Sequence, residues 1–222
     1  MRYDIRYKPS FAAAFITLNP GERITAEAGA MASMDGRLMM TTEFSGGFLS
    51  GLVRRLFGRE SLFVNVFQNR SGSPAEVVLT QGSIGDIEVL ELKPGEELCF
   101  QSGAYIAHAG SVRMSVHWAG FGSLFAGEGL FKLKLVGPGL VLFGAYGGIS
   151  KRQVRGELVV DNGHLVAYDP KISFNLRLSG GLVKSVTSGE GIINRLKGHG
   201  IIYVQSRSLD GLLRFLRPKV RN

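Results

Sequence analysis

Hydrophobic and polar residues alternate along several short segments of the chain, which is the pattern of a β-strand with one buried face. The alternation is unbroken over eight residues in Ser111–Trp118 and again in Lys171–Leu178. A third such segment, Arg37–Phe44, follows the hairpin signal Asp35-Gly36. Because strand-like segments recur between short turns, the sequence predicts an all-β protein with antiparallel strands.

Markers that recur in constant register predict three internal repeats. The sequence Pro20-Gly21-Glu22 returns as Pro94-Gly95-Glu96 and, without the proline, as Arg155-Gly156-Glu157. Three further sets of positions share one spacing, 74 and then 60 residues: Gly29, Gly103 and Gly163; Leu38, Val112 and Ile172; and Gly46, Gly120 and Gly180. We therefore expect repeats of about 1–81, 82–144 and 145–206, packed with pseudo-threefold symmetry in one domain of residues 1–206, followed by a basic tail, 207–222.

Each repeat ends with two apolar stretches that a predicted turn separates. The turn is Asn69–Pro74 in the first repeat, Gly137–Gly139 in the second and Gly198–Gly200 in the third. Glycine and proline at these places favour chain reversal.

Two segments follow helical rather than strand spacing. Apolar residues near 48–58, around Arg54 and Arg55, predict a short basic helix that ends at Gly58. Leucines spaced three and four residues apart predict a second helix over 208–217, capped by Ser208 and closed by Pro218. The simpler interpretation is that both helices pack on the chain's own sheet or on a neighbouring subunit. Contact with an anionic membrane surface is the alternative.

Composition adds a basic surface and a single thiol. The 222 residues carry a net charge of +8, and the last 16 contribute half of it. The basic residues of this tail are Arg207, Arg214, Arg217, Lys219 and Arg221. Such a cluster favours contact with phosphate groups or anionic lipid. The one cysteine, Cys99, has apolar neighbours, so we expect a buried, inert thiol and a reducing, cytoplasmic compartment.

Motifs of covalent or metal chemistry are missing from the sequence, so we expect no catalytic residue, cofactor or bound metal. The four histidines are predicted to be hydrogen-bonded or exposed rather than metal ligands. Three glutamates, Glu60, Glu128 and Glu190, recur beside glycine in matching loops. We interpret them as residues that hold tight turns, and a shared cation site is the alternative.

Five segments resemble one known family. They are Ala26–Gly36, Ser102–Ala104, Gly127–Phe131, Asp161–Asp169 and Ser188–Ile192. The family is the mitochondrial biogenesis family named for altered inheritance of mitochondria, and the resemblance runs from the first strand to about Ser206. It implies a fold similar to the tryptophan RNA-binding attenuation protein, within the double-stranded β-helix class. It brings no catalytic residues, and a fungal member supports the organisation of the mitochondrial inner membrane.

These observations favour a non-enzymatic scaffold that acts by binding. We expect a homo-oligomer in the cytoplasm, with an anionic membrane surface or another protein as partner. Nucleic-acid binding through the basic surface and tail is the alternative. It is not favoured, because the alternation places Trp118 and Phe174 on the buried face, whereas RNA-binding surfaces expose aromatic residues among basic ones. An enzyme with a small-molecule pocket stays open as a third class, because such pockets can lack motifs.

Overall fold

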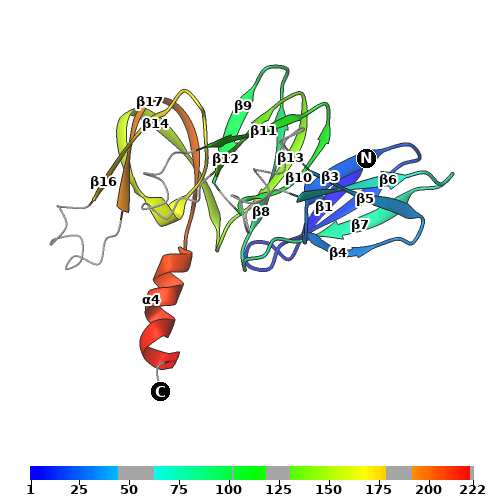
Figure 1. The fold of residues 1–222 in the computed structure, drawn as a ribbon, viewed down its shortest axis with the longest axis horizontal. Coiled ribbons are helices and arrows are strands. Elements are labelled where there is room, and N and C mark those ends of the chain that lie inside the picture. Colours follow the sequence, from blue (N-terminus) through cyan, green and yellow to red (C-terminus); the bar gives the residue numbers. More distant parts are fainter. Residues whose placement is uncertain (45–62, 102, 119–130, 179–191, 221–222) are drawn as a thin grey trace.

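The described residues form three antiparallel β-sheets and a helix near the C-terminus. A computed structural model describes residues 1–44, 63–101, 103–118, 131–178 and 192–220. The sheets follow one another along the long axis of the molecule, from the blue N-terminal part to the orange C-terminal part (Figure 1). The prediction of a β protein is confirmed at this level.

The first sheet has the strand order β1 (Arg2–Arg6), β2 (Ala13–Leu18), β7 (Ala75–Leu79) and β4 (Met31–Met34). The second has the order β5 (Leu38–Phe44), β6 (Phe63–Asn69), β3 (Arg23–Glu27), β10 (Tyr105–Gly110), β13 (Gly139–Gly144) and β8 (Ile87–Leu92). The third has β11 (Arg113–Trp118), β12 (Phe131–Val136), β9 (Glu97–Phe100), β15 (Leu165–Tyr168), β17 (Ile192–Gln205) and β14 (Ile149–Asp161), and β16 (Ser173–Leu178) also pairs with β17. A short 3-10 turn, η1 (Asn162–His164), precedes β15.

Three clusters of buried apolar side chains form the core: the first joins the first and second sheets, the second joins the second and third, and the third lies within the third sheet. The first includes Ile16 and Phe67, and the third includes Leu196, all of them fully buried. In the second, the rings of Phe100 and Phe143 lie 5.4 Å apart and those of Phe143 and Tyr203 5.1 Å apart. These inward side chains are the apolar members of the alternating pattern, which is why the strands form where they do.

Two strand pairs join consecutive parts of the chain in the same geometry. β3 pairs with β10, and β9 pairs with β15, both antiparallel. The paired residues are Ala26 with Ala107 and Thr25 with His108 at the first junction, and Phe100 with Ala167 and Cys99 with Tyr168 at the second. Within the described residues, β4 and β14 end their sheets and pair on one side only.

The predicted strands are confirmed as β5, β11 and β16, but the predicted turn at Gly198–Gly200 is wrong. β17 runs without interruption from Ile192 to Gln205, and Gly198 pairs with Gly156 of β14. Both glycines have positive φ, 131° and 89°, so the two paired strands can deform together where other residues would be strained. The turns at Gly137–Gly139 and Asn69–Pro74 do separate strands, as predicted.

The C-terminal helix, α4, spans Leu209–Val220 and therefore continues beyond the predicted end at Pro218. Proline removes one backbone hydrogen bond and crowds the carbonyl of the preceding turn, and only two helical residues follow it here. The helix predicted near 48–58 lies outside the described residues.

Candidate functional site

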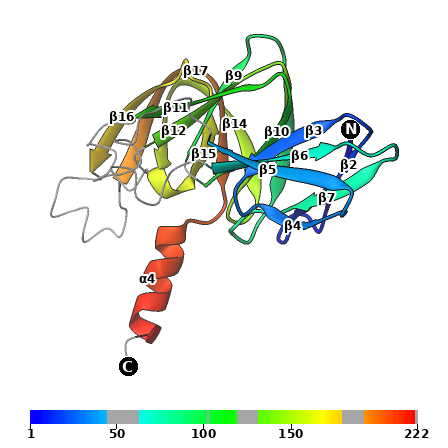
Figure 2. The ribbon, with the colours of Figure 1, turned by 45° about the vertical axis from the view of Figure 1, so that its right-hand side comes forward.

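The C-terminal helix begins at a side-chain cap and extends away from the sheets. The Ser208 Oγ accepts a hydrogen bond from the Gly211 N–H at 3.2 Å, and its carbonyl accepts one from the Leu212 N–H at 3.1 Å. The predicted cap is therefore confirmed. Both ribbon views show α4 extending below the β body (Figures 1 and 2).

The apolar side chains of α4 are exposed to solvent. The exposed fractions are 57% for Leu209, 53% for Leu213, 59% for Phe215 and 39% for Leu216. Leu212, in contrast, is half-buried. The interpretation that this helix packs on the chain's own sheet is therefore wrong for most of its apolar face.

The charged residues of α4 are basic except Asp210. Arg207, just before the helix, and Arg214, Arg217 and Lys219 within it are all exposed. The Lys219 ammonium lies 3.7 Å from the centre of the Phe215 ring, which leaves a cation beside an aromatic side chain. The other predicted basic contacts, Arg54, Arg55 and Arg221, lie outside the described residues.

The first turn of α4 and the link between β7 and β8 both line a cavity of about 530 Å³. Leu209 and Leu212 line it from the helix, and Ile84 lines it from the link. Gln101 also lines this cavity, and both atoms of its amide group are buried without a hydrogen-bond partner. Glu27 is a further lining residue, and burial raises the pKa of its carboxyl group.

The three recurrent glutamates, Glu60, Glu128 and Glu190, also lie outside the described residues, so their predicted role stays a prediction.

Two other glutamates, Glu22 and Glu96, hold turns in the way that we expected of the recurrent three. The Glu22 Oε2 accepts the Asn19 N–H at 2.7 Å, and the Glu96 Oε2 accepts the Lys93 N–H at 2.8 Å. Burial alone raises the pKa of Glu22, but hydrogen bonds from the Met1 amino group and from Asn19 outweigh it and lower that pKa. The sequence signal for both is the Pro-Gly-Glu marker itself.

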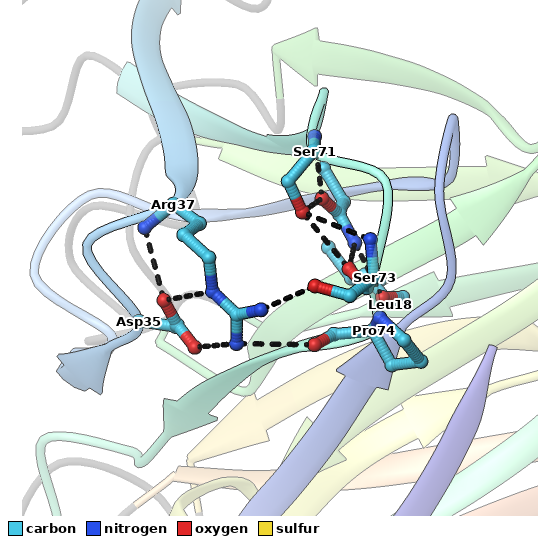
Figure 3. Close-up of polar contacts among 7 residues, drawn as sticks. Leu18, Asp35, Arg37, Ser71, Ser73 and Pro74 are labelled. Carbon is cyan, nitrogen blue, oxygen red and sulfur yellow. Dashed lines mark hydrogen bonds and ion pairs between the residues drawn. The ribbon is translucent and has the colours of Figure 1, made fainter.

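A second polar cluster ties the turn before β5 to the turn before β7 (Figure 3). The Arg37 guanidinium bonds both carboxylate oxygens of Asp35 and also donates to the Ser73 hydroxyl and the Pro74 carbonyl. Hydrogen bonds from Arg37 lower the pKa of Asp35 to about 2. Asn69, fully buried nearby, donates to the carbonyls of Leu18 at 2.8 Å and Ser73 at 2.9 Å. These groups satisfy one another, so we assign the cluster a structural role.

Two histidines are hydrogen-bonded, as predicted. The Tyr105 hydroxyl lies 3.1 Å from the Thr25 carbonyl, to which it donates, and 2.7 Å from the His108 Nδ1. Because that single proton is already given to Thr25, His108 is assigned the tautomer whose Nδ1–H donates to Tyr105. Burial, with a smaller effect of Arg23, lowers the pKa of His108 to about 4. The His164 Nδ1 lies 2.7 Å from the Gln205 carbonyl and donates to it.

Cys99 is buried and free of disulfide bonds, as expected from its apolar neighbours. Across the described parts of the chain, no three His, Cys, Asp or Glu side chains come close enough to hold a metal ion. In the same residues, every helix is too short or too polar to cross a membrane.

The three antiparallel sheets and the exposed basic helix define a largely β protein with an exposed apolar face on its C-terminal helix. The chain belongs to the AIM24 family: residues 3–207 match the family described as mitochondrial biogenesis AIM24. The match ends before α4, and the resemblance seen in the sequence is confirmed.

A relative and a solved structure cover nearly the whole chain. An uncharacterised protein of Streptococcus pyogenes serotype M6 is 31% identical over 220 residues, which are 95% of this chain and 87% of the relative. The crystal structure of protein SPYM3_0169 from Streptococcus pyogenes is similar with a TM-score of 0.78 and 27% identity, and the match covers 99% of both chains.

Proposed function

We propose that this protein is a non-enzymatic scaffold that binds an anionic membrane surface through α4, at the cytoplasmic face. The observation that carries the proposal is the exposed apolar face of a helix whose charges are basic except for Asp210. A helix of this kind lies in the plane of the membrane interface, with its leucines among the acyl chains and its arginines at the headgroups.

The expected binding energy has two comparable parts. Burying a leucine or phenylalanine side chain completely contributes about 1.5–3 kcal/mol, so four side chains that are about half exposed contribute roughly 3–6 kcal/mol. Each basic residue near an anionic surface adds about 1 kcal/mol. The loss of motional freedom on binding opposes both. Because neither part is large alone, binding should need both the apolar face and the anionic lipid.

Co-sedimentation with vesicles tests this proposal. Leu213→Ser and Leu216→Ser should each weaken binding to phosphatidylserine-containing vesicles about tenfold, whereas Met40→Ser, at an exposed residue of β5, should bind like the wild type. Equal binding by all four proteins would contradict the role of α4. Strong binding to mixed RNA that persists at high salt would instead favour the nucleic-acid alternative.

We also propose the three-repeat architecture, similar to the tryptophan RNA-binding attenuation protein, with homo-oligomers formed through the free sheet edges. The support is the identical pairing at the β3–β10 and β9–β15 junctions. At the corresponding positions β10 and β15 are mostly buried, whereas Met31, Ala32 and Ser33 of β4 are exposed. Val159 of β14 is likewise 49% exposed. Unpaired edges of this kind are templates for a further strand.

The junctions give the register that this assembly requires. If β4 of one copy pairs with β14 of the next as β10 pairs with β3, Ser33 lies opposite Val160, and Met34 lies opposite Val159. Ser33→Cys combined with Val160→Cys should then form a disulfide between copies under mild oxidation. The control is Ser33→Cys with Gln153→Cys, which is exposed on the other half of β14. Equal cross-linking in the two pairs, or none in the first, would contradict this register.

A further inference from the structure

A second exposed apolar patch lies at the same edge of the molecule as the start of α4. Its members are Tyr7 and Phe11, in the loop between β1 and β2, and Ile84, in the link between β7 and β8. They are 64%, 70% and 59% exposed. In both ribbon views the dark-blue loop after β1 lies at the lower edge of the β body, from which α4 extends (Figures 1 and 2).

Backbone hydrogen bonds hold the members of this patch together. The Phe11 N–H donates to the Tyr7 carbonyl at 3.1 Å, which closes the loop. The adjoining Ala12 N–H donates to the Gly85 carbonyl at 2.9 Å and so places the loop beside Ile84. Tyr7 has a positive φ of 62°, which is rare for a residue with a side chain. The residue with this unfavourable backbone angle is thus also one whose ring is exposed.

The same backbone network continues to the residues that precede α4. Gly85 forms a bridge with Gly147, whose N–H donates to the Ile84 carbonyl at 3.0 Å. The neighbouring Gly148 N–H donates to the Ser206 Oγ at 2.9 Å, two residues before the helix cap. A chain of hydrogen bonds therefore fixes the aromatic loop relative to the base of α4.

The cavity of about 530 Å³ joins the two surfaces, because Ile84 of the patch and Leu209 and Leu212 of α4 all line it. The ammonium group of Lys8, within the loop, lies 3.4 Å from a carboxylate oxygen of Asp86 and 3.7 Å from one of Glu88. Both acidic residues near the patch therefore have a positive partner.

We infer that Tyr7, Phe11 and Ile84 form a second membrane contact, which enters the same lipid interface as α4 and fixes the orientation of the β body on it. This inference rests on the proposed function. Tyrosine and phenylalanine suit the boundary between headgroups and acyl chains, because their rings are apolar and the tyrosine hydroxyl stays hydrated. A rigid link between two weak contacts makes the second contact intramolecular once the first has formed, which raises the overall affinity.

The test uses an environment-sensitive fluorophore on an introduced cysteine, with phosphatidylserine-containing vesicles as the probe. The three labelled variants are Phe11→Cys, Leu213→Cys in α4, and Met40→Cys in β5 as the control. Because Cys99 is buried, it should label little. We expect the emission at positions 11 and 213 to shift to shorter wavelength on binding, and the emission at position 40 to stay unchanged.

The outcomes separate this inference from the proposed function. A shift at position 213 without one at position 11 overturns the second contact and leaves binding through α4 intact. The absence of a shift at both positions overturns both. Unlabelled Phe11→Ser should also bind the vesicles about tenfold more weakly than the wild type, with unchanged thermal stability, because a ring that is 70% exposed contributes little to the core. Wild-type affinity in this variant would contradict the inference.

Discussion

The network beneath the two apolar surfaces makes a sharp prediction for Gly85→Ala. A Cβ atom built at residue 85 would lie 1.9 Å from the Ala145 carbonyl oxygen and 2.6 Å from the Gly147 nitrogen. Both are backbone atoms, so no flexible side chain can move aside. The two segments must separate by about an ångström or more to restore ordinary contact.

The cost follows from the hydrogen bonds that this separation breaks. The Asp86 N–H donates to the Gly147 carbonyl at 2.9 Å, the Gly147 N–H to Ile84 at 3.0 Å and the Ala145 N–H to Asp86 at 3.1 Å. At about 0.5–1.5 kcal/mol each, their loss destabilises the fold by about 2–4 kcal/mol. For a domain of this size, that lowers the melting temperature by about 5–15 °C.

Thermal unfolding followed by circular dichroism measures this effect, and Gly82→Ala is the matched control. Gly82 lies in the same link, and a Cβ atom there would meet nothing within 4 Å. We expect this control to melt within about 2 °C of the wild type. If Gly85→Ala melted with the control, the contact between residues 85 and 147 would not be as close as described, and the fixed link to α4 would be refuted.

Three further results are expected. Asn69→Ala should lower the free energy of unfolding in urea by about 2–4 kcal/mol, because it leaves two carbonyl groups without their hydrogen-bond donor. Asn65→Ala, which removes an exposed hydrogen bond with Thr42, should lower it by less than about 1 kcal/mol, and equal losses would contradict the role of Asn69. The pKa of His108 is lowered from 6.5 to about 4 in the folded protein, so as the pH falls the unfolded chain binds this proton before the folded one does. The free energy of unfolding should therefore be full above about pH 6.5 and decrease between pH 6.5 and 4. Melting curves across this range should show a smaller decline in His108→Gln, and an unchanged decline would refute the assignment. Filter binding to mixed RNA should be weak and lost by about 200 mM salt, and nanomolar binding at that salt would refute the preference for lipid.

Local sequence patterns predicted the elements whose structure depends on neighbouring residues. The alternation in Lys171–Leu178 became β16, and the Ser208 cap marks the start of α4. The Gly-His-Gly segment at 198–200 was misread, because glycine permits either a turn or a bend within a strand. Pairing with β14, more than 40 residues away in the sequence, decides between the two.

Exposure could not be predicted from the pattern of α4, because leucines at helical spacing suit both a docked and a free helix. The structure leaves most of them in solvent. The Tyr7–Phe11 loop gave no signal either, since its proximity to α4 depends on contacts among three distant segments. The strands at the sheet edges could be predicted only in part. The spacing of the markers suggested related units, but only the strand pairing shows which strands end the sheets.

The most direct test of the account is the partitioning of the full chain between buffer and vesicles, compared with a chain that ends at Ser208. With vesicles that contain phosphatidylserine, the full chain should sediment and the shortened chain should remain mostly in solution, while both melt at the same temperature. With vesicles of phosphatidylcholine alone, both should stay largely unbound. If the shortened chain sediments as well as the full chain on anionic vesicles, α4 is not the membrane-binding element and the proposed function is wrong.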